Sequence, residues 1–219
     1  MLNLSNRNLE ALRGPLKALE TRPEKAVQLL RILRDQPEPL FAILDAARDP
    51  KVLEILKHSP EKYQSLYEGS KATELAPYAP YLVRLPVDSS LLETLVDEGW
   101  GKAWGIYFTC NESFDVVRNH LCHFVLVRGE DGRPLYFRFY DPRVLRHAIP
   151  LMNPEEATAF FGPVSGYLME SELPSHLVRY TTTDGGVMRS EASLEDQTEP
   201  ANPLLPAAQT PAQAGPSQD

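Results

Sequence analysis

The sequence predicts an α+β fold whose sheet is mixed but largely antiparallel and is flanked by short helices. Short apolar runs bounded by turn residues alternate with amphipathic stretches that begin at Ser, Asp or Asn caps. The runs 124–127 and 135–140 also flank the turn 129–133, which is typical of an antiparallel hairpin. With 219 residues, of which 42% are hydrophobic, the chain can form one principal domain without disulfides or a structural metal.

The N-terminal segment 1–36 is predicted to be helical. A Gly-Pro pair at 14–15 divides it into two helices. The second helix opens with the capping box Thr-Arg-Pro-Glu at 21–24 and continues as an apolar stripe across 26–33, which needs a packing partner. After two prolines, the apolar run 40–44 predicts a buried strand.

Three helices are then predicted from their caps and apolar stripes. One begins at a Ser-Pro-Glu sequence and covers 59–67, and the next begins at a capping box and covers 90–98. Asn111 is expected to cap the third, because apolar residues recur behind it at helical spacing. The strands predicted between these helices cover 81–85, 103–108 and 123–128.

Two further helices are predicted where an N-cap residue precedes a proline. Asp141 precedes Pro142, and Asn153 opens the capping box Asn-Pro-Glu-Glu. Two more strands, over 164–169 and 176–182, complete a predicted domain over 39–183.

The last residues, 190–219, are predicted to form a disordered tail. This segment has five acidic residues, no basic residue and no aromatic residue, and Pro, Ala, Gln, Ser and Thr dominate it. Such a composition buries too little apolar surface to offset the entropy of ordering the chain. Because the formal net charge of the chain is -8, the tail accounts for most of it.

Composition also predicts the compartment and excludes some partners. The negative net charge argues against nucleic-acid binding, which needs a basic face. No apolar run approaches the length of a membrane span, and the first residues do not resemble a secretory signal. The two cysteines, Cys110 and Cys122, form no CxxC pair and are expected to be reduced thiols, so the predicted localisation is cytoplasmic.

Three short motifs contain residue types used in catalysis or in metal and cofactor binding, but none predicts a catalytic residue, a metal ligand or a cofactor site. The glycine-rich stretch 99–105 lacks the GxGxxG spacing of a nucleotide loop. The sequence His-Leu-Cys-His at 120–123 has no second ligand pair, and its histidines are expected to straddle a helix-to-strand boundary. In 162–166 a proline replaces the glycine that a nucleophile elbow needs, and Asp141 is expected to be a helix cap before a general base.

The arginines around the predicted hairpin form the best candidate contact patch. Five arginines stand between 128 and 146 against three acidic residues. Arg138 is expected to share a strand face with Tyr136 and Tyr140, where guanidinium and rings can stack. Two readings stay open: a solvated face whose arginines pair with local acids, and a surface that docks an acidic protein.

Taken together, several blocks resemble the adaptor-chaperone family of bacterial type VI secretion, long known only as a domain of unknown function. The most specific block is Phe-Arg-Phe-Tyr-Asp-Pro-Arg-Val at 137–144. The resemblance covers about 39–172, and its blocks lie at 40–50, 65–69, 75–83, 99–105, 135–145 and 160–163.

The resemblance implies a non-enzymatic protein without a cofactor, which holds a toxic effector and helps to load it onto a VgrG-type spike protein. The alternatives are an immunity-like inhibitor that binds a toxin and, less favoured, an uncharacterised enzyme. Motif positions carried over as structural are Trp104, Pro142 and Gly162. Those expected at or beside a partner-binding surface are Tyr136, Arg138, Tyr140, Asp141, Arg143 and Arg146.

Overall fold

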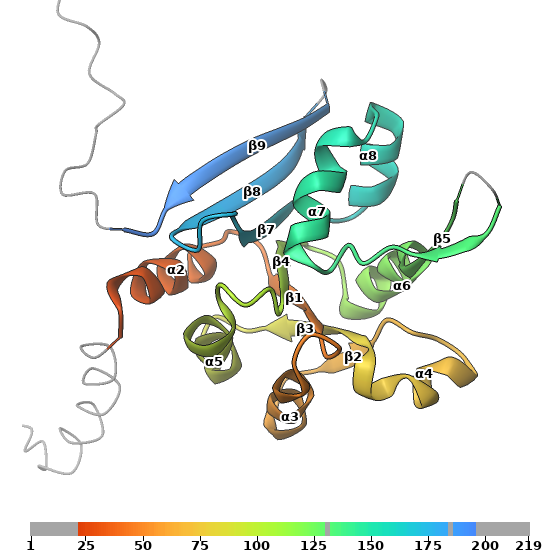
Figure 1. Ribbon diagram of the computed structural model, residues 1–219. Coiled ribbons are helices and arrows are strands. Elements are labelled where there is room, and N and C mark those ends of the chain that lie inside the picture. The colour runs from red at the N-terminus through yellow and green to blue at the C-terminus, as the bar shows by residue number, and fades with distance from the viewer. Residues whose placement is uncertain (1–21, 130–131, 184–185, 196–219) are drawn as a thin grey trace, which may run out of the picture.

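The computed structural model describes residues 22–129, 132–183 and 186–195 (Figure 1). Their core is a seven-stranded sheet with the strand order β2-β3-β1-β4-β7-β8-β9, and every pairing in it is antiparallel. The predicted α+β class and the largely antiparallel sheet are therefore confirmed. The strands are β1 (Leu40–Asp45), β2 (Tyr63–Ser65), β3 (Pro80–Leu85), β4 (Gly105–Thr109), β7 (Gly166–Glu170), β8 (His176–Thr183) and β9 (Gly186–Ser193).

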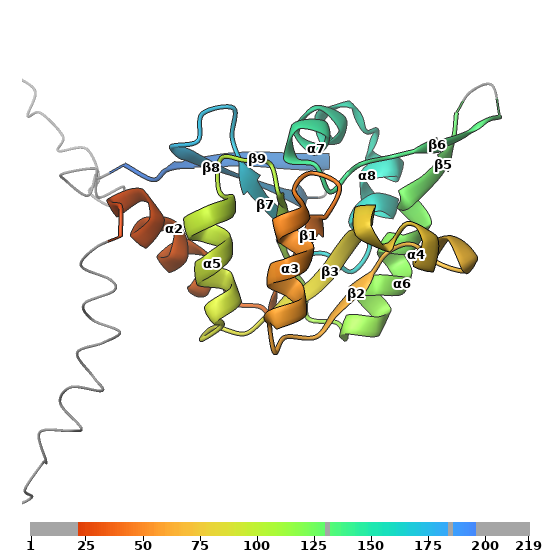
Figure 2. The ribbon, with the colours of Figure 1, turned by 60° about the horizontal axis from the view of Figure 1, so that its bottom comes forward.

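Helices cover both faces of the sheet, which is why all six residues of the central strand β1 are buried. Figure 2 shows α2, α5 and α3 side by side on one face. Their apolar stripes pack on Leu40, Ala42 and Leu44 of β1, whereas α6, α7 and α8 pack on Phe41 and Ile43. The helices are α2 (Glu24–Arg34), α3 (Pro50–His58), α4 (Ser70–Glu74), α5 (Ser90–Gly99), α6 (Phe114–Val125), α7 (Pro142–Ala148) and α8 (Pro154–Phe161), with 3-10 turns η1 (Ala76–Tyr78) and η2 (Ile149–Leu151).

The predicted hairpin is confirmed but is shorter than expected. β5 (Leu126–Arg128) pairs with β6 (Pro134–Tyr136) in a two-stranded sheet of its own. The strand predicted over 123–128 is wrong at its start, because the apolar stripe of α6 continues to Val125 and keeps that segment helical. The strand predicted over 135–140 ends at Tyr136, and the chain then turns toward α7.

One helix was predicted in the wrong place. Residues 59–67 are not helical, because α3 occupies 50–58 and β2 covers Tyr63–Ser65. Asp49 caps α3 by accepting a hydrogen bond from the Lys51 N–H at 2.9 Å, and a proline stands at the first position of the helix. Ser59, which was expected to open a helix, ends this one instead.

Three helices begin at other caps than predicted. Ser89 rather than Ser90 caps α5, and Ser113 rather than Asn111 caps α6. Pro23 precedes α2 without a side-chain cap, and the Thr of the predicted capping box at 21 lies outside the described residues. α2 nevertheless buries its predicted stripe against α5.

The predicted tail begins too early. Residues 190–193 belong to β9, and Leu194 is fully buried, so the ordered domain extends beyond 183. The rest of the predicted tail, 196–219, and the first predicted helix, within 1–21, lie outside the described residues.

Candidate functional site

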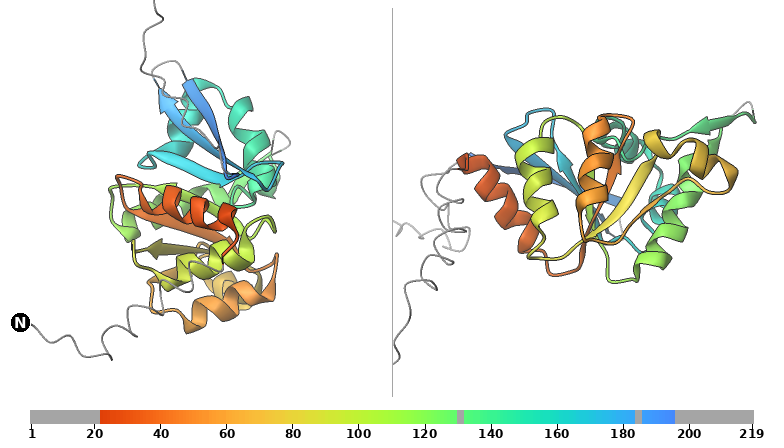
Figure 3. Two further views of the ribbon diagram at one scale, coloured as in Figure 1. Left: turned by 90° about the vertical axis from the view of Figure 1, so that its left-hand side faces the viewer. Right: turned by 90° about the horizontal axis from the view of Figure 1, so that it is seen from below.

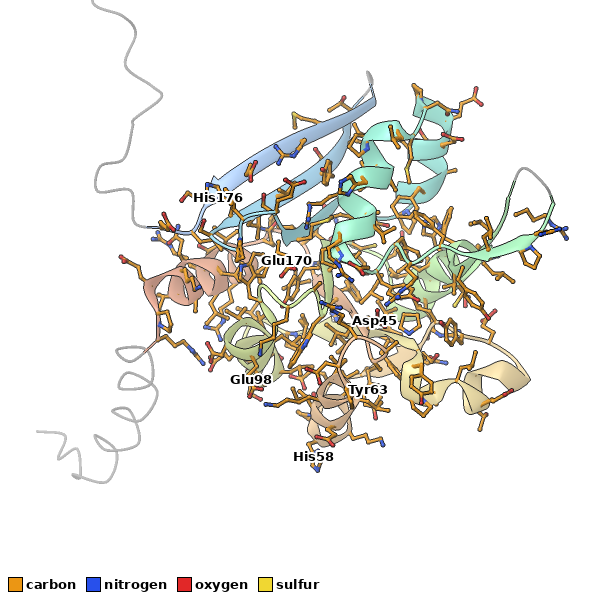
Figure 4. The ribbon with its side chains drawn as sticks, in the orientation of Figure 1. Asp45, His58, Tyr63, Glu98, Glu170 and His176 are labelled. Atoms are coloured by element: carbon orange, nitrogen blue, oxygen red, sulfur yellow. The ribbon has the colours of Figure 1, made fainter. Side chains whose placement is uncertain are left out.

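Residues from distant parts of the sequence meet where β1 ends and β4 begins. Asp45, the last residue of β1, is only 1% exposed (Figure 4). Its backbone N–H donates to the Trp104 carbonyl at 2.7 Å, and its carboxylate accepts a hydrogen bond from Arg138 at 2.5 Å. The Arg138 side chain is 44% exposed, and the pKa of its guanidinium is raised by the bond to Asp45. Arg138 therefore neutralises a buried carboxylate that would otherwise be costly.

Asp141 is a helix cap, as predicted. Its carboxylate accepts the backbone N–H of Arg143 at 2.9 Å and pairs with the Arg143 guanidinium at 2.6 Å. Burial opposes ionisation of Asp141, but these bonds from Arg143 outweigh it and hold its pKa below the ordinary value. Pro142 fills the first position of α7 and is buried.

A third buried carboxylate, Glu170, ends β7 beside these two. It accepts the Gly101 N–H at 2.6 Å, while the Arg146 guanidinium donates to the Glu170 backbone carbonyl at 2.7 Å. Burial raises the pKa of Glu170, and the bonds from Gly101 and Ala103 offset this only in part. These two bonds join the end of β7 to the turn before β4 and to α7.

We call this set of residues the charge cluster. It contains three buried carboxylates and three arginines whose polar groups bond to the fold: Asp45, Asp141, Glu170, Arg138, Arg143 and Arg146. The expected pairing with a local acid is found for Arg143, which pairs with Asp141. Arg138 instead pairs with Asp45, 93 positions away in the chain, and Arg146 donates to a backbone carbonyl. These bonds join β1 and β7 to α7 and the segment before it, so the cluster holds this end of the sheet together, although the side chains of Arg138 and Arg143 remain 44% and 49% exposed.

The strand face expected to hold Tyr136, Arg138 and Tyr140 is wrong, although Arg138 does lie over the Tyr140 ring, with its guanidinium carbon 6.0 Å from the ring centroid. Because β6 ends at Tyr136, Arg138 and Tyr140 do not follow it on one strand face. Tyr140 is 2% exposed and hydrogen-bonded to Tyr67, and its pKa is raised by burial first and by that bond second. Tyr136 is 51% exposed, and its ring meets the ring of Tyr67 edge-on at 6.0 Å. Partner binding by these residues stays a prediction.

The other two motif residues serve packing. Trp104 is buried, and its ring lies so close to Gly99 that a side chain at Gly99 would collide with it. Gly162 ends α8 with a φ of 49°, and a Cβ there would collide with the ring of His120. A side chain larger than hydrogen is therefore excluded at both glycines.

The His-Leu-Cys-His sequence is structural in its hydrogen bonds. Both histidines lie within α6, not across a helix-to-strand boundary. His120 bonds to the Phe160 carbonyl at 2.9 Å, and His123 bonds to the Asn119 carbonyl at 2.6 Å. Cys122 is half-buried, and burial raises the pKa of its thiol to about 11. Within 22–129, 132–183 and 186–195, no three His, Cys, Asp or Glu residues are grouped to hold a metal ion.

The β5–β6 hairpin carries three of the large apolar side chains that the described residues leave exposed. Leu126 and Tyr136 are opposed on one face, and Leu135 stands opposite Val127 on the other. Leu126, Leu135 and Tyr136 are each about half exposed, at 50%, 53% and 51%. Figures 1 and 2 show the hairpin extending away from the body of the molecule.

An apolar groove of about 490 Å³ adjoins this hairpin. Val127 lines it from the hairpin, and Leu151, at 84% exposure, stands at its rim. Its remaining walls come from α6, α7, α8 and the segments beside them, namely Phe124, Phe137, Ala148, Met152, Glu156, Ala159 and Phe160. Leu135 shares the hairpin face of Val127, whereas Leu126 and Tyr136 lie on the other face. Exposed apolar surface beside a groove of this kind marks sites of protein interaction.

Sequence reasoning missed Asp45 and most of the groove. Nothing near Asp45 in the sequence indicates its partner, because Arg138 lies 93 positions away. For the groove, the available signal was the alternation of apolar residues in the hairpin strands, which predicted pairing but not which side chains stay uncovered. No helix of the described segments is long and apolar enough to cross a membrane.

Comparisons with known proteins agree with the resemblance at the level of the family. The model of the family described as a domain of unknown function, DUF4123, matches residues 40–159, from β1 to α8. Comparison with curated proteins gave no match, and comparison with solved structures gave none either. Since the match covers more than half of the chain, the protein belongs to the DUF4123 family, which is associated with effector adaptors of type VI secretion.

Proposed function

We propose that this protein is an adaptor of type VI secretion, which binds a toxic effector in the cytoplasm and helps to load it onto a VgrG-type spike protein. In this proposal it acts by reversible binding, with no catalytic step and no cofactor. Its membership of a family associated with such adaptors supports the proposal. The observation that carries it is the uncovered apolar surface of the hairpin and its groove.

We assign this surface to the effector, as the site for an apolar segment of it. A short isolated hairpin gains little stability from exposing leucine and tyrosine to water, so these residues are explained by a partner that covers them. Aromatic and large aliphatic side chains around a concave centre are typical of the buried core of an interface. Glu156 is the one acidic group lining the groove, which leaves it predominantly apolar.

The state of the buried acids supports a binding role over a catalytic one. Asp45, Asp141 and Glu170 are all hydrogen-bonded by groups of the fold. A general acid or base must reach a proton on a substrate, and these carboxylates are 1%, 3% and 9% exposed. Their arrangement is that of a structural lock.

The first test is affinity capture of the tagged protein from its native bacterium while type VI secretion is expressed, followed by mass spectrometry. Recovery of a spike protein together with a toxin is expected. A toxin recovered without the spike, and inhibited by this protein, would support the inhibitor instead, and recovery of neither would overturn the proposal.

The second test locates the effector site with two matched substitutions. Leu151→Ser removes the most exposed apolar side chain at the groove rim, and Leu173→Ser removes an exposed leucine, 60% exposed, from the loop between β7 and β8. Toxin recovery should fall with Leu151→Ser and stay unchanged with Leu173→Ser. Equal recovery with both variants would move the effector site elsewhere on the domain.

A further inference from the structure

The two edges of the seven-stranded sheet differ in length. β2 forms one edge with three residues, whereas β9 forms the other with eight. Figure 1 and the left view of Figure 3 show β9 at the margin of the sheet, and no described strand pairs with its outer side. A long edge strand presents unpaired backbone groups to any strand that fits it, so its side chains decide what can pair there.

The hydrogen bonds of β8 show which residues of β9 face outward. The Ser171 N–H donates to His176 at 3.0 Å, and the Leu194 N–H donates to Ser175 at 2.8 Å. The backbone groups of even-numbered residues of β8 therefore form hydrogen bonds with β7. Those of odd-numbered residues of β8 form hydrogen bonds with the even-numbered residues of β9. The backbone groups that point to the free edge belong to Val187, Arg189, Glu191 and Ser193.

These outward residues carry opposite charges two positions apart. Arg189 and Glu191 are ion-paired with each other at 2.6 Å on one face of the strand, and both are exposed. The Glu191 carboxylate also accepts a hydrogen bond from Ser171 at 2.6 Å. An antiparallel copy of this strand, centred on Ser190, would place Arg189 opposite Glu191 of the partner subunit.

We propose that β9 is a homodimerisation edge, at which two copies of this chain pair antiparallel around Ser190 and join their sheets into one. In this register the four outward residues of each strand all meet outward residues of the other, so their backbone groups can form ladder hydrogen bonds. The two Arg-Glu pairs formed across the dyad are the cross-strand arrangement that stabilises a sheet.

Side-chain size supports the same register. Met188, which is 54% exposed, would stand opposite the small Ala192 of the partner subunit, and Val187 opposite Ser193 of the partner subunit. Ser190 is the one residue in this register that lies opposite the same residue of the partner subunit.

The neighbouring registers that keep the outward residues in phase are disfavoured by charge. Moving the dyad by one residue toward the N-terminus places Arg189 opposite Arg189 of the partner subunit. Moving it the other way places Glu191 opposite Glu191 of the partner subunit. Like charges directly opposite each other are destabilising, so the sequence of β9 selects one self-pairing.

The test is sedimentation of the full chain over a concentration series, in the absence of other proteins. The wild type should show a reversible monomer-dimer equilibrium, since one strand pair buries less surface than a stable interface needs. Arg189→Glu and Glu191→Arg should each raise the dissociation constant by about tenfold or more, because each variant aligns like charges across the dyad. The combined variant R189E/E191R should restore dimerisation, because it exchanges the charges on both strands.

Two controls separate pairing from folding. Arg31→Glu reverses the charge of an arginine on α2 that forms another exposed ion pair, with Asp35 at the end of that helix, and should leave the dimer intact. Hydrogen exchange should show the amides of Arg189 and Glu191 becoming protected as concentration rises. A wild type that stays monomeric, or a combined variant that dissociates as the single variants do, would overturn the proposal. If shortening the chain to Glu195 creates the dimer, the C-terminal segment and not a second copy occupies this edge.

Discussion

The β5–β6 hairpin and the segment that follows it, 137–146, are consecutive in the chain but are built for opposite purposes. In the hairpin, Leu126, Leu135 and Tyr136 are about half exposed, although all three are large and apolar. In the following segment the polar Asp141 is 3% exposed and the apolar Phe139 is fully buried. The hairpin thus leaves apolar surface open, whereas the next ten residues bury an aromatic ring and a carboxylate while their arginines stay partly exposed.

The residues that identify the family are therefore not the same as the residues best suited to bind a partner. The block at 137–144 is the most specific part of the resemblance, yet its side chains hold the end of the sheet through Arg138 and cap α7 through Asp141. The surface best suited to a partner lies beside that block, and of the six residues expected at a partner-binding surface only Tyr136 is part of it. The comparison therefore predicts that substitutions in 137–146 lower stability, whereas substitutions in the hairpin weaken partner binding.

The largest effect is expected from Phe139→Ala. The Phe139 ring is fully buried and lies edge-on to Phe160 at 5.7 Å. Removing it leaves a cavity in the core on the α6 and α8 side and should lower the free energy of unfolding by about 3 to 5 kcal/mol. Urea denaturation followed by circular dichroism measures this change. If the free energy of unfolding fell by less than about 1 kcal/mol, the segment 137–146 would not have the structural role assigned to it here.

Arg138→Glu should have the next largest effect and lower the free energy of unfolding by about 2 to 3 kcal/mol. This is less than for a fully buried pair, because the Arg138 side chain is 44% exposed. The substitution places a second carboxylate beside Asp45, which is nearly inaccessible to solvent. Denaturation should show the loss directly, and Asp45→Asn in the same chain should recover part of it. If the Arg138→Glu variant unfolds at the same urea concentration as the wild type but no longer binds a partner, Arg138 acts in partner binding and the charge cluster does not depend on it.

Asp141→Ala should cost about 1 kcal/mol at neutral pH, the usual value of a helix cap. Because the pKa of Asp141 is lowered in the folded state, its ionised form contributes stability above the unfolded pKa of about 4, and this contribution is lost as the pH falls through the folded pKa. The stability difference between wild type and variant should therefore narrow below about pH 4. Asp141→Asn keeps a capping oxygen without the charge, so its free energy of unfolding at neutral pH should lie between those of the wild type and Asp141→Ala. If the difference between wild type and Asp141→Ala did not change with pH, Asp141 would stabilise the fold by its capping hydrogen bond and not by its charge.

The sequence predicted those elements whose signal is local. The Asx-Pro caps at Asp141 and Asn153 and the apolar runs of β1 and β3 were enough to locate two helices and two strands. Predicting β9 failed, because an edge strand with one exposed face can be polar and so resembles a tail. An Asp-Gly pair at 184–185, a typical hairpin signal, was the evidence that could have extended the domain.

The candidate site was less predictable because it depends on long-range contacts. The bond between Asp45 and Arg138 joins residues from β1 and the approach to α7, and no pattern near either one specifies it. Likewise, the spacing of Tyr136 and Tyr140 suggested a shared strand face until the early end of β6 placed one outside and the other in the core. Periodicity predicts which side chains can share a face only while the element continues.

Leu135→Ser should have the smallest effect on stability and the sharpest effect on the comparison. Leu135 is 53% exposed on the face of the hairpin that includes Val127, so serine removes little buried surface and should change the free energy of unfolding by less than about 0.5 kcal/mol. If the hairpin and the groove hold the effector, the same change should weaken its binding at least tenfold, measured by titration calorimetry with the captured toxin. Leu173→Ser is the control, because it makes the same substitution at an exposed leucine on another loop. A variant that binds normally but unfolds early would show that the hairpin, like the segment after it, exists to hold the fold.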